Sequence, residues 1–283
     1  MADVPMQMSL NQLEREYSPS SVAPDFMSIV EQYRAASDFI CTRHVPLRVW
    51  YGNSADEYSL LFEPAGAAAS SMLVFIHGGY WQELSAQDSC FPAEGLLARG
   101  IAYAAINYSL APSADLPGMV RQCGLALRSL QAARPECRIV IAGSSAGAHL
   151  AAMMMTLDWD CAEGRRPPFA AALLISGVYD LRPLVPTYIN KPLNLNMDSA
   201  LALSPQSRPL LTTCPTVVCF GQQETAAFKQ QSRAFAQRLL DVGAEVSLYE
   251  VAGRNHFDIV FDISQSATLI GADVLRLSGA QQQ

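Results

Sequence analysis

Residues 139–150 read IVIAGSSAGAHL, and this stretch decides the fold. The apolar run 139–142 predicts a buried strand, and the small residues from Ala146 onward predict a helix. Between them lies the G-x-S-x-G spacing of a strand-to-helix turn so tight that its central residue takes a strained backbone. Such a turn lifts the Ser145 side chain above the sheet, at the positive N-terminal end of the helix. Ser145 is therefore the expected nucleophile, in preference to Ser144.

The alternation of short apolar runs with longer helical periods continues along the chain and predicts an α/β, doubly wound fold. Strands that alternate with helices of this length imply a mostly parallel central sheet with helices on both faces. A chain of 283 residues favours one domain, spanning residues 1–283 with an insertion, over two domains. The expected strands are residues 45–50, 58–62, 72–76, 101–106, 139–142, 171–175, 216–220 and 245–251. The expected helices include residues 119–130, 146–156, 226–240 and 259–277.

Two segments do not fit this alternation. Residues 9–40 carry helical periods with polar flanks, and residues 177–210 are rich in proline without a clear period. An irregular stretch of this length inside a compact domain is usually functional. We expect the N-terminal helical segment and the insertion together to form a small lid over the sheet.

A serine nucleophile needs a base, and the chain contains four histidines. His44 precedes the sheet, and His149 lies one turn beyond Ser145 on a helix that runs into the core, so neither is expected to reach the serine. His77 belongs to a glycine loop and is expected to hold that loop by hydrogen bonding. His256 follows the last expected strand, on a loop that returns to the carboxyl edge of the sheet. His256 is therefore the expected base.

The base needs a carboxylate that orients it, expected between the serine and the histidine in chain order. Glu224 follows a strand and a turn at Gly221, which matches the expected arrangement best. Asp180, after the preceding strand, remains the alternative. Asp258 is too close to His256 in sequence to face its far ring nitrogen.

The string FIHGGYWQEL, residues 75–84, places two glycines directly after an expected strand. Attack by a serine puts negative charge on a carbonyl oxygen, which preorganised N–H groups must stabilise. The backbone amides of Gly78, Gly79 and Tyr80 are the expected donors from this loop, with that of Ala146 after the nucleophile. Side chains at the glycines would block the oxyanion. Tyr80 and Trp81 are expected to wall the space beside the reacting carbonyl.

The composition excludes several other classes of protein. A net charge of −7 without any basic run argues against a nucleic-acid surface. No apolar stretch reaches the length that spans a bilayer, so no membrane partner is expected. No two histidines have the spacing of metal ligands, and we expect neither a metal nor another cofactor.

The cysteines and the first residues bear on the compartment. Residues 1–12 are polar and lack the pattern of a signal peptide. The scattered cysteines have no C-x-x-C spacing, which favours reduced thiols in a cytoplasm over disulfides or zinc. We therefore expect a cytoplasmic protein, and the sequence leaves open whether it forms a homodimer. The seven cysteines are Cys41, Cys90, Cys123, Cys137, Cys161, Cys214 and Cys219.

Several strings together resemble the kynurenine formamidases, or arylformamidases, which are α/β-hydrolases related to the hormone-sensitive-lipase group of esterases. These strings are HGGYWQ, GSSAGAHL, SGVYDLRPL and NHFD, with LEREYSPSS near the start and PTYIN in the insertion. The resemblance covers nearly the whole chain and implies the α/β-hydrolase fold. It also implies nucleophile Ser145, acid Glu224 and base His256. The string NYSLAPS departs from the related esterases, because Ser109 and Ser113 replace charged residues.

The resemblance implies hydrolysis of N-formyl-kynurenine to kynurenine and formate, a step of tryptophan catabolism, through a formyl-enzyme on Ser145. The formyl group is small, and the flat aniline leaving group needs aromatic walls. Tyr80 and Trp81, with Tyr188 and Asn190 of the insertion as lid contacts, are the expected substrate-binding residues. The alternatives are a carboxylesterase or a carbamate or amide hydrolase acting on short-acyl aryl substrates, and a non-catalytic binding module.

Overall fold

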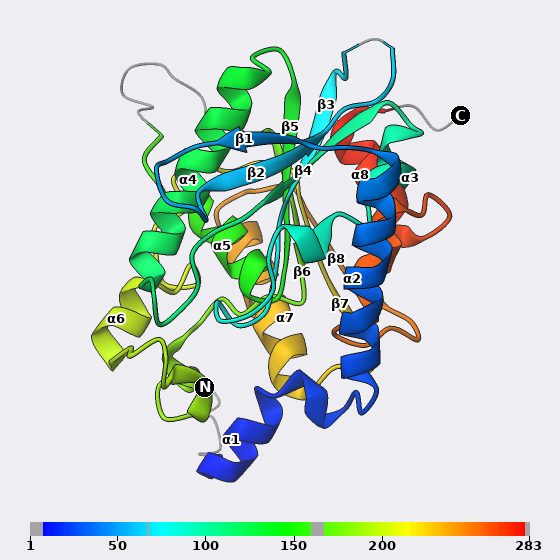
Figure 1. The fold of residues 1–283 in the computed structure, drawn as a ribbon. Helices are drawn as coiled ribbons and strands as arrows, with labels where there is room; N and C mark the ends of the chain where they lie inside the picture. Colours follow the sequence, from blue (N-terminus) through cyan, green and yellow to red (C-terminus); the bar gives the residue numbers. More distant parts are fainter. Residues whose placement is uncertain (1–7, 67, 160–166, 281–283) are drawn as a thin grey trace.

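The computed structural model describes residues 8–66, 68–159 and 167–280, and within them eight strands form one sheet (Figure 1). Strands β1 and β2 and strands β2 and β4 pair antiparallel, and all other pairs are parallel, which confirms the mostly parallel sheet. The strand order is β1-β2-β4-β3-β5-β6-β7-β8. The strands are β1 Leu47–Trp50, β2 Tyr58–Phe62, β3 Ser71–Ile76, β4 Ile101–Ile106, β5 Arg138–Ser144, β6 Ala171–Ile175, β7 Thr216–Gly221 and β8 Val246–Val251.

Two expectations from the sequence fall partly outside the described residues. These are Cys161 and residues 1–7, the larger part of the stretch expected to lack a signal peptide. The cysteines that the structure does describe are free thiols. No helix in the described ranges combines the length and the apolar character needed to cross a bilayer.

Helices cover both faces of the sheet, as the sequence predicted. One apolar core lies between the sheet and α4, α5 and α7, and a second lies between the opposite face and α2, α3 and α8 (Figure 1). Each strand from β3 to β7 is therefore buried on both sides, which explains its continuous apolar sequence. The helices are α2 Phe26–Arg43, α3 Ala93–Leu97, α4 Leu116–Ala133, α5 Ala146–Met154, α7 Ala226–Asp241 and α8 Leu269–Ser278.

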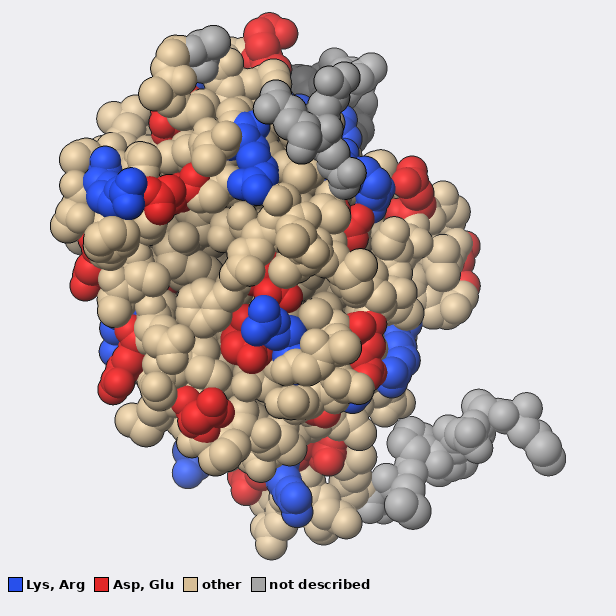
Figure 2. Space-filling model, turned by 90° about the vertical axis from the view of Figure 1, so that its right-hand side faces the viewer, with Lys and Arg blue, Asp and Glu red and all other residues tan. Residues whose placement is uncertain are grey.

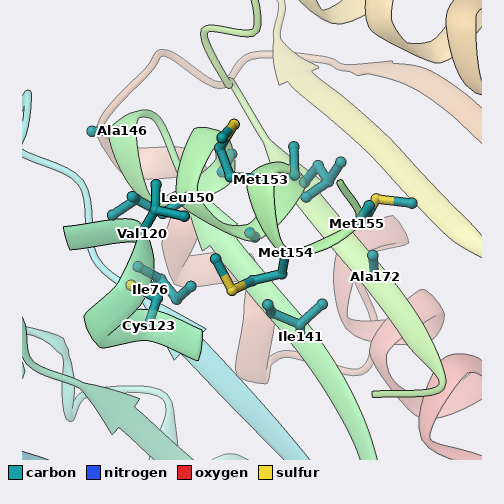
Figure 3. Close-up of a cluster of buried hydrophobic side chains, with 14 of the residues drawn as sticks. Ile76, Val120, Cys123, Ile141, Ala146, Leu150, Met153, Met154, Met155 and Ala172 are labelled. Atoms are coloured by element: carbon teal, nitrogen blue, oxygen red, sulfur yellow. The ribbon is translucent and has the colours of Figure 1, made fainter. Parts of the chain in front are cut away.

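Helix α5 is the best packed of these helices, because each of its residues is buried. Figure 3 shows Leu150 and Met154 of α5 on the side of the helix that carries Val120 and Cys123 of α4 and Ile141 of β5. The small residues of α5 let it approach the sheet closely, and its methionines fill the irregular spaces that remain. A helix held this tightly gives the residue at its N-terminus, Ser145, a fixed position.

The predicted bounds of the last helix are wrong. The sequence predicted a single helix over residues 259–277, but the structure has a 3-10 helix, η6 Asp258–Ser264, followed by α8. The break lies at Thr268, whose hydroxyl accepts a hydrogen bond from Gly271 N at 3.1 Å. A side chain that caps a new helix competes with continuation of the previous one.

The two segments outside the alternation touch each other. The N-terminal segment forms α1 Leu10–Glu16, η1 Pro19–Ser21 and α2, and the insertion forms η4 Arg182–Leu184, η5 Tyr188–Asn190 and α6 Met197–Ala202. Ser18 Oγ and Tyr188 Oη lie 2.8 Å apart, and Tyr188 N donates to Glu14 Oε1 at 3.1 Å. Both segments border the same pocket, described below.

The surface that carries α2 and α8 has charges of both signs. Figure 2 shows Lys and Arg side chains interspersed there with Asp and Glu. This face therefore has a mixed pattern of charge rather than a basic stripe.

Candidate active site

The turn between β5 and α5 has the geometry that its sequence predicted. Ser145, the N-cap residue of α5, has φ 56° and ψ −120°, a backbone that residues with a side chain rarely adopt. A Cβ on Gly147 would lie 1.9 Å from Ile76 O, and a Cβ on Gly143 would lie 2.3 Å from Gly147 O. Only glycine fits at both positions, and this is why the turn can be so tight.

A histidine and a carboxylate form a buried pair beside this turn. His256 Nδ1–H donates to Glu224 Oε2 at 2.9 Å, and both side chains are at least 95% buried. The second carboxylate oxygen, Oε1, accepts hydrogen bonds from Ser176 Oγ at 2.6 Å and from Gly221 N at 2.5 Å. Glu224 is thus held on both oxygens, and it fixes His256 with a proton on Nδ1 and Nε2 available as acceptor.

The loops after β7 and β8 carry the two members of this pair, and they are packed together. A Cβ on Gly221 would lie 2.4 Å from Arg254 O. Gln223 N donates to the same carbonyl at 2.9 Å. The close approach of the two main chains is what brings residue 224 against residue 256.

The alternative acids do not meet His256. The Asp180 carboxylate forms an ion pair with Arg182 at 2.7 Å. Asp258 Oδ1 accepts from Asn255 N at 2.7 Å and so closes the turn around the histidine. The structure therefore brings Glu224, rather than Asp180, to the imidazole.

The other buried histidines have structural contacts. His77 Nδ1–H donates to Gly78 O at 2.9 Å, and its ring stacks on Tyr108 with the centroids 4.2 Å apart, so it holds the glycine loop as expected. His149 Nε2–H donates to Leu203 O at 2.8 Å. Burial lowers the pKa of both His77 and His149 to about 4, so both are neutral near pH 7. His44, which is only partly buried, follows the last residue of α2, and its Nε2 lies 3.5 Å from Glu94 Oε1.

The glycine loop after β3 lies against the Ser145 turn. A Cβ on Gly78 would lie 3.3 Å from Ser145 Cβ, so a side chain there would crowd the serine. Gly79 has φ 92°, and its Cβ would lie 2.2 Å from Glu83 O, so packing within the loop also requires this glycine. Within the described ranges, the amides of Gly78, Gly79 and Ala146 donate to no other group of the protein. These N–H groups are available to a ligand.

A cavity of about 250 Å³ opens over these residues. It lies at the carboxyl ends of β3 and β5, where ligands bind in open α/β sheets. Ser145, His256 and the glycine loop form part of its lining, and aromatic side chains form another part. The aromatic lining residues are Phe26, Tyr33, Phe75, Tyr80, Phe91, Tyr188 and Phe257. Within the described residues, no group of three or more His, Cys, Asp or Glu side chains is arranged to hold a metal ion.

Comparison with known proteins identifies this architecture. A family model described as the alpha/beta hydrolase fold matches residues 73–259, which include the glycine loop, the Ser145 turn and His256. The chain belongs to the α/β-hydrolase family. The hydrolase is 30% identical to the kynurenine formamidase of Danio rerio, over 96% of this chain and 97% of that protein. The resemblance that the sequence motifs suggested is thereby confirmed.

Solved structures share the fold of the hydrolase. A proposed thioesterase from Silicibacter sp. TM1040 superposes with a TM-score of 0.81 at 25% identity, covering 93% of this chain and 98% of that one. An esterase of the bacterial hormone-sensitive lipase family gives a TM-score of 0.66 at 17% identity, covering 90% of this chain and 96% of that one. These likenesses confirm the α/β-hydrolase fold.

Two residues of the hydrolase that were expected to bind substrate, Trp81 and Asn190, do not line the cavity. Trp81 is 0% exposed and packs edge-on against His149, with the ring centroids 5.0 Å apart, in the core behind the pocket. Trp81 is not among the described residues that line the cavity, whereas its neighbour Tyr80 is. The Asn190 side chain binds main-chain groups of its own loop, donating to Val185 O and Leu195 O at 2.9 and 2.8 Å. Asn190 therefore shapes the insertion, whereas Tyr80 and Tyr188 do line the cavity.

Other residues of the site were not predicted from the sequence. Ser176 supports the carboxylate of Glu224, and its place directly after β6 at the carboxyl edge was a usable signal. The aromatic wall that α2 supplies through Phe26 and Tyr33 was not predicted. The helical period of residues 26–33 was visible, but period alone does not say which face of a helix meets a pocket.

Proposed function

We propose that the hydrolase cleaves a small aryl formamide, with N-formyl-kynurenine as the substrate and kynurenine and formate as the products. The observation that carries this proposal is the buried Glu224–His256 pair, whose histidine lines the same cavity as Ser145. The relationship to the kynurenine formamidase of Danio rerio supports the choice of substrate.

The proposed reaction uses three side chains in turn. His256 Nε2 takes the proton of Ser145 Oγ, which attacks the formyl carbon, while Glu224 stabilises the imidazolium that forms. The amides of Gly78, Gly79, Tyr80 and Ala146 are the proposed donors to the oxyanion. His256 then protonates the departing aniline nitrogen, which leaves a formyl ester on Ser145. Water, activated by the same histidine, releases formate.

The aromatic lining supports a flat leaving group. His256 must reach the leaving nitrogen to protonate it, so the leaving group lies on the side of the cavity next to this residue. Phe257, Phe26, Tyr33 and Phe91 line the cavity together with His256. Aromatic and apolar walls of this kind favour an aryl ring through stacking and edge-to-face contacts.

The test compares initial rates on N-formyl-kynurenine and p-nitrophenyl acetate, with Ser145→Ala as the blank. We expect cleavage of both by the wild-type protein, and a loss in kcat of roughly three orders of magnitude or more in the variant. A fluorophosphonate should label Ser145 in the wild-type protein. Activity that survives in Ser145→Ala, or labelling at another residue, rules out this nucleophile.

A second candidate activity is hydrolysis of short-acyl aryl esters. No Lys or Arg is among the described residues that line the cavity, so the carboxylate of an amino-acid substrate has no basic partner there. An uncharged aryl ester needs no such partner. Cleavage of p-nitrophenyl acetate without cleavage of N-formyl-kynurenine would favour this activity.

A further inference from the structure

Helix α2 donates a hydrogen bond to the loop that carries His256. Tyr33 is 7% exposed, and its hydroxyl donates a hydrogen bond to the carbonyl oxygen of Phe257, the residue after His256. The ring of Tyr33 stacks on Phe91, with centroids 5.3 Å apart, and meets Phe261 edge-on at the same distance. Tyr33 therefore connects the N-terminal segment directly to the main chain beside His256.

The helix that carries Tyr33 is itself fixed to the body of the protein. Ser37 Oγ, one turn further along α2, accepts hydrogen bonds from Cys90 N and Phe91 N, each at 3.0 Å. Arg34 Nε pairs with Asp88 Oδ1 at 2.9 Å. The hydroxyl of Tyr33 is therefore presented from a rigid support and not from a loose segment.

Other groups hold the imidazole of His256 and the amide side of the turn, and the hydroxyl of Tyr33 binds the carbonyl that follows. Glu224 holds Nδ1, and Phe228 packs edge-on against the imidazole with ring centroids 4.5 Å apart. Asn255 Oδ1 accepts from Phe257 N at 2.8 Å, which fixes the turn on its amide side. On the carbonyl side of Phe257, Tyr33 is the side chain that supplies a donor.

We propose that Tyr33 is a positioning residue for His256: its hydroxyl holds the Phe257 carbonyl so that the imidazole stays aimed at the leaving group. The inference rests on the proposed function, in which His256 acts as base and then as acid. Burial raises the pKa of the Tyr33 hydroxyl, so the group remains a donor over the working pH range.

Displacement of the His256 imidazole should lower the hydrolysis rates of different substrates by different factors, depending on the basicity of the leaving group. A good leaving group such as p-nitrophenolate departs without being protonated, whereas a more basic one depends on the proton that His256 donates. A misaligned donor therefore costs more when the leaving group is more basic. A purely structural role of Tyr33 would lower both rates by the same factor.

The experiment measures kcat/KM of Tyr33→Phe on p-nitrophenyl acetate and on phenyl acetate, which share one acyl group. The matched control is Tyr249→Phe, which removes a hydroxyl bonded to Asp273 at 2.8 Å between β8 and α8. We expect Tyr33→Phe to lose about threefold on the nitrophenyl ester and about tenfold or more on the phenyl ester, a small part of the factor that acid–base catalysis supplies. Tyr249→Phe should change neither by more than about twofold. Assays below the melting temperature of every variant prevent lost stability from being read as lost activity.

Equal losses on the two esters, or no loss beyond that of Tyr249→Phe, would overturn the inference. His256→Ala separates this failure from failure of the proposed function. Full activity in His256→Ala would refute the role of the histidine itself. An inactive His256→Ala together with an unaffected Tyr33→Phe would refute the role of Tyr33 alone. Because both test substrates are aryl esters, the result does not depend on whether N-formyl-kynurenine is cleaved.

Discussion

Glu224 is the residue on which the proposed chemistry depends most after Ser145 and His256. Its carboxylate accepts from His256 Nδ1 and, on the other oxygen, from Ser176 and Gly221. These three donors fix the orientation of the Glu224 carboxylate. Glutamate, which is one methylene longer than aspartate, spans the distance from the loop after β7 to the imidazole.

Replacing Glu224 by glutamine is expected to lower kcat by on the order of a hundredfold or more. The amide cannot select the Nδ1-protonated tautomer of His256 as the carboxylate does. The matched variant is Asp180→Asn, which loses an ion pair with Arg182 and should reduce kcat much less. Steady-state kinetics on p-nitrophenyl acetate measures both. The opposite ranking would transfer the role of acid to Asp180.

Trp81 shows how a residue next to the site can serve the core. Trp81→Ala should lower the free energy of unfolding by about 3–5 kcal/mol, because a fully buried indole leaves a cavity behind. Trp50, 51% exposed on β1, is the matched position, and Trp50→Ala should cost well under half as much. Urea unfolding followed by circular dichroism compares the two. Equal costs would contradict the buried position of Trp81.

At the scale of elements, helix α2 precedes the first strand of the sheet and supplies one wall of the pocket. Phe26 lies in its first turn and packs against Phe257, with ring centroids 5.3 Å apart. The wall is therefore continuous from the N-terminal segment to the loop of the base. On the proposed mechanism, this wall contacts the leaving group rather than the acyl group.

Phe26→Ala should lower kcat/KM for aryl acetates by about tenfold and that for ethyl acetate much less, since a shaped apolar contact with the ring is lost. Met27, the next residue, is 65% exposed, so Met27→Ala is the control from the same turn. The ratio of the two kcat/KM values is the measurement. An unchanged ratio in Phe26→Ala would mean that the aryl group binds elsewhere.

The elements differ in how far the sequence could predict them. Strands β3 to β7 were predictable because burial on both faces makes their sequences continuous apolar runs. The Ser145 turn was predictable because glycines at positions 143 and 147 are a steric requirement. The burial of Trp81 was not predictable, because it depends on contacts such as that with His149, which form only in the folded chain. Asn190 was likewise misassigned, because its partners are main-chain atoms that come near only in the folded insertion.

At the scale of the whole molecule, two neutral histidines buried in the core should make stability depend on pH. Burial lowers the pKa of His77 and His149 to about 4, whereas in the unfolded chain both titrate near 6.5. Their full contribution is present above about pH 6.5 and is lost as the pH falls toward 4, because the unfolded state alone binds protons in this window. Each accounts for at most about 3 kcal/mol.

Urea unfolding at about pH 7.5 and about pH 5 measures this loss. His149→Gln should flatten part of the dependence, because glutamine can still donate to Leu203 O and does not titrate. A free energy of unfolding that is the same at both pH values would contradict the burial of these two imidazoles.

The groups that meet in the pocket come from distant parts of the chain. Along the chain, residues 26–33 precede Ser145, and Glu224 and His256 follow it. A translation product that stops before β8 contains Ser145 but lacks His256. On the proposed mechanism, unfinished chains are therefore inert, and hydrolysis begins only when synthesis has passed residue 256.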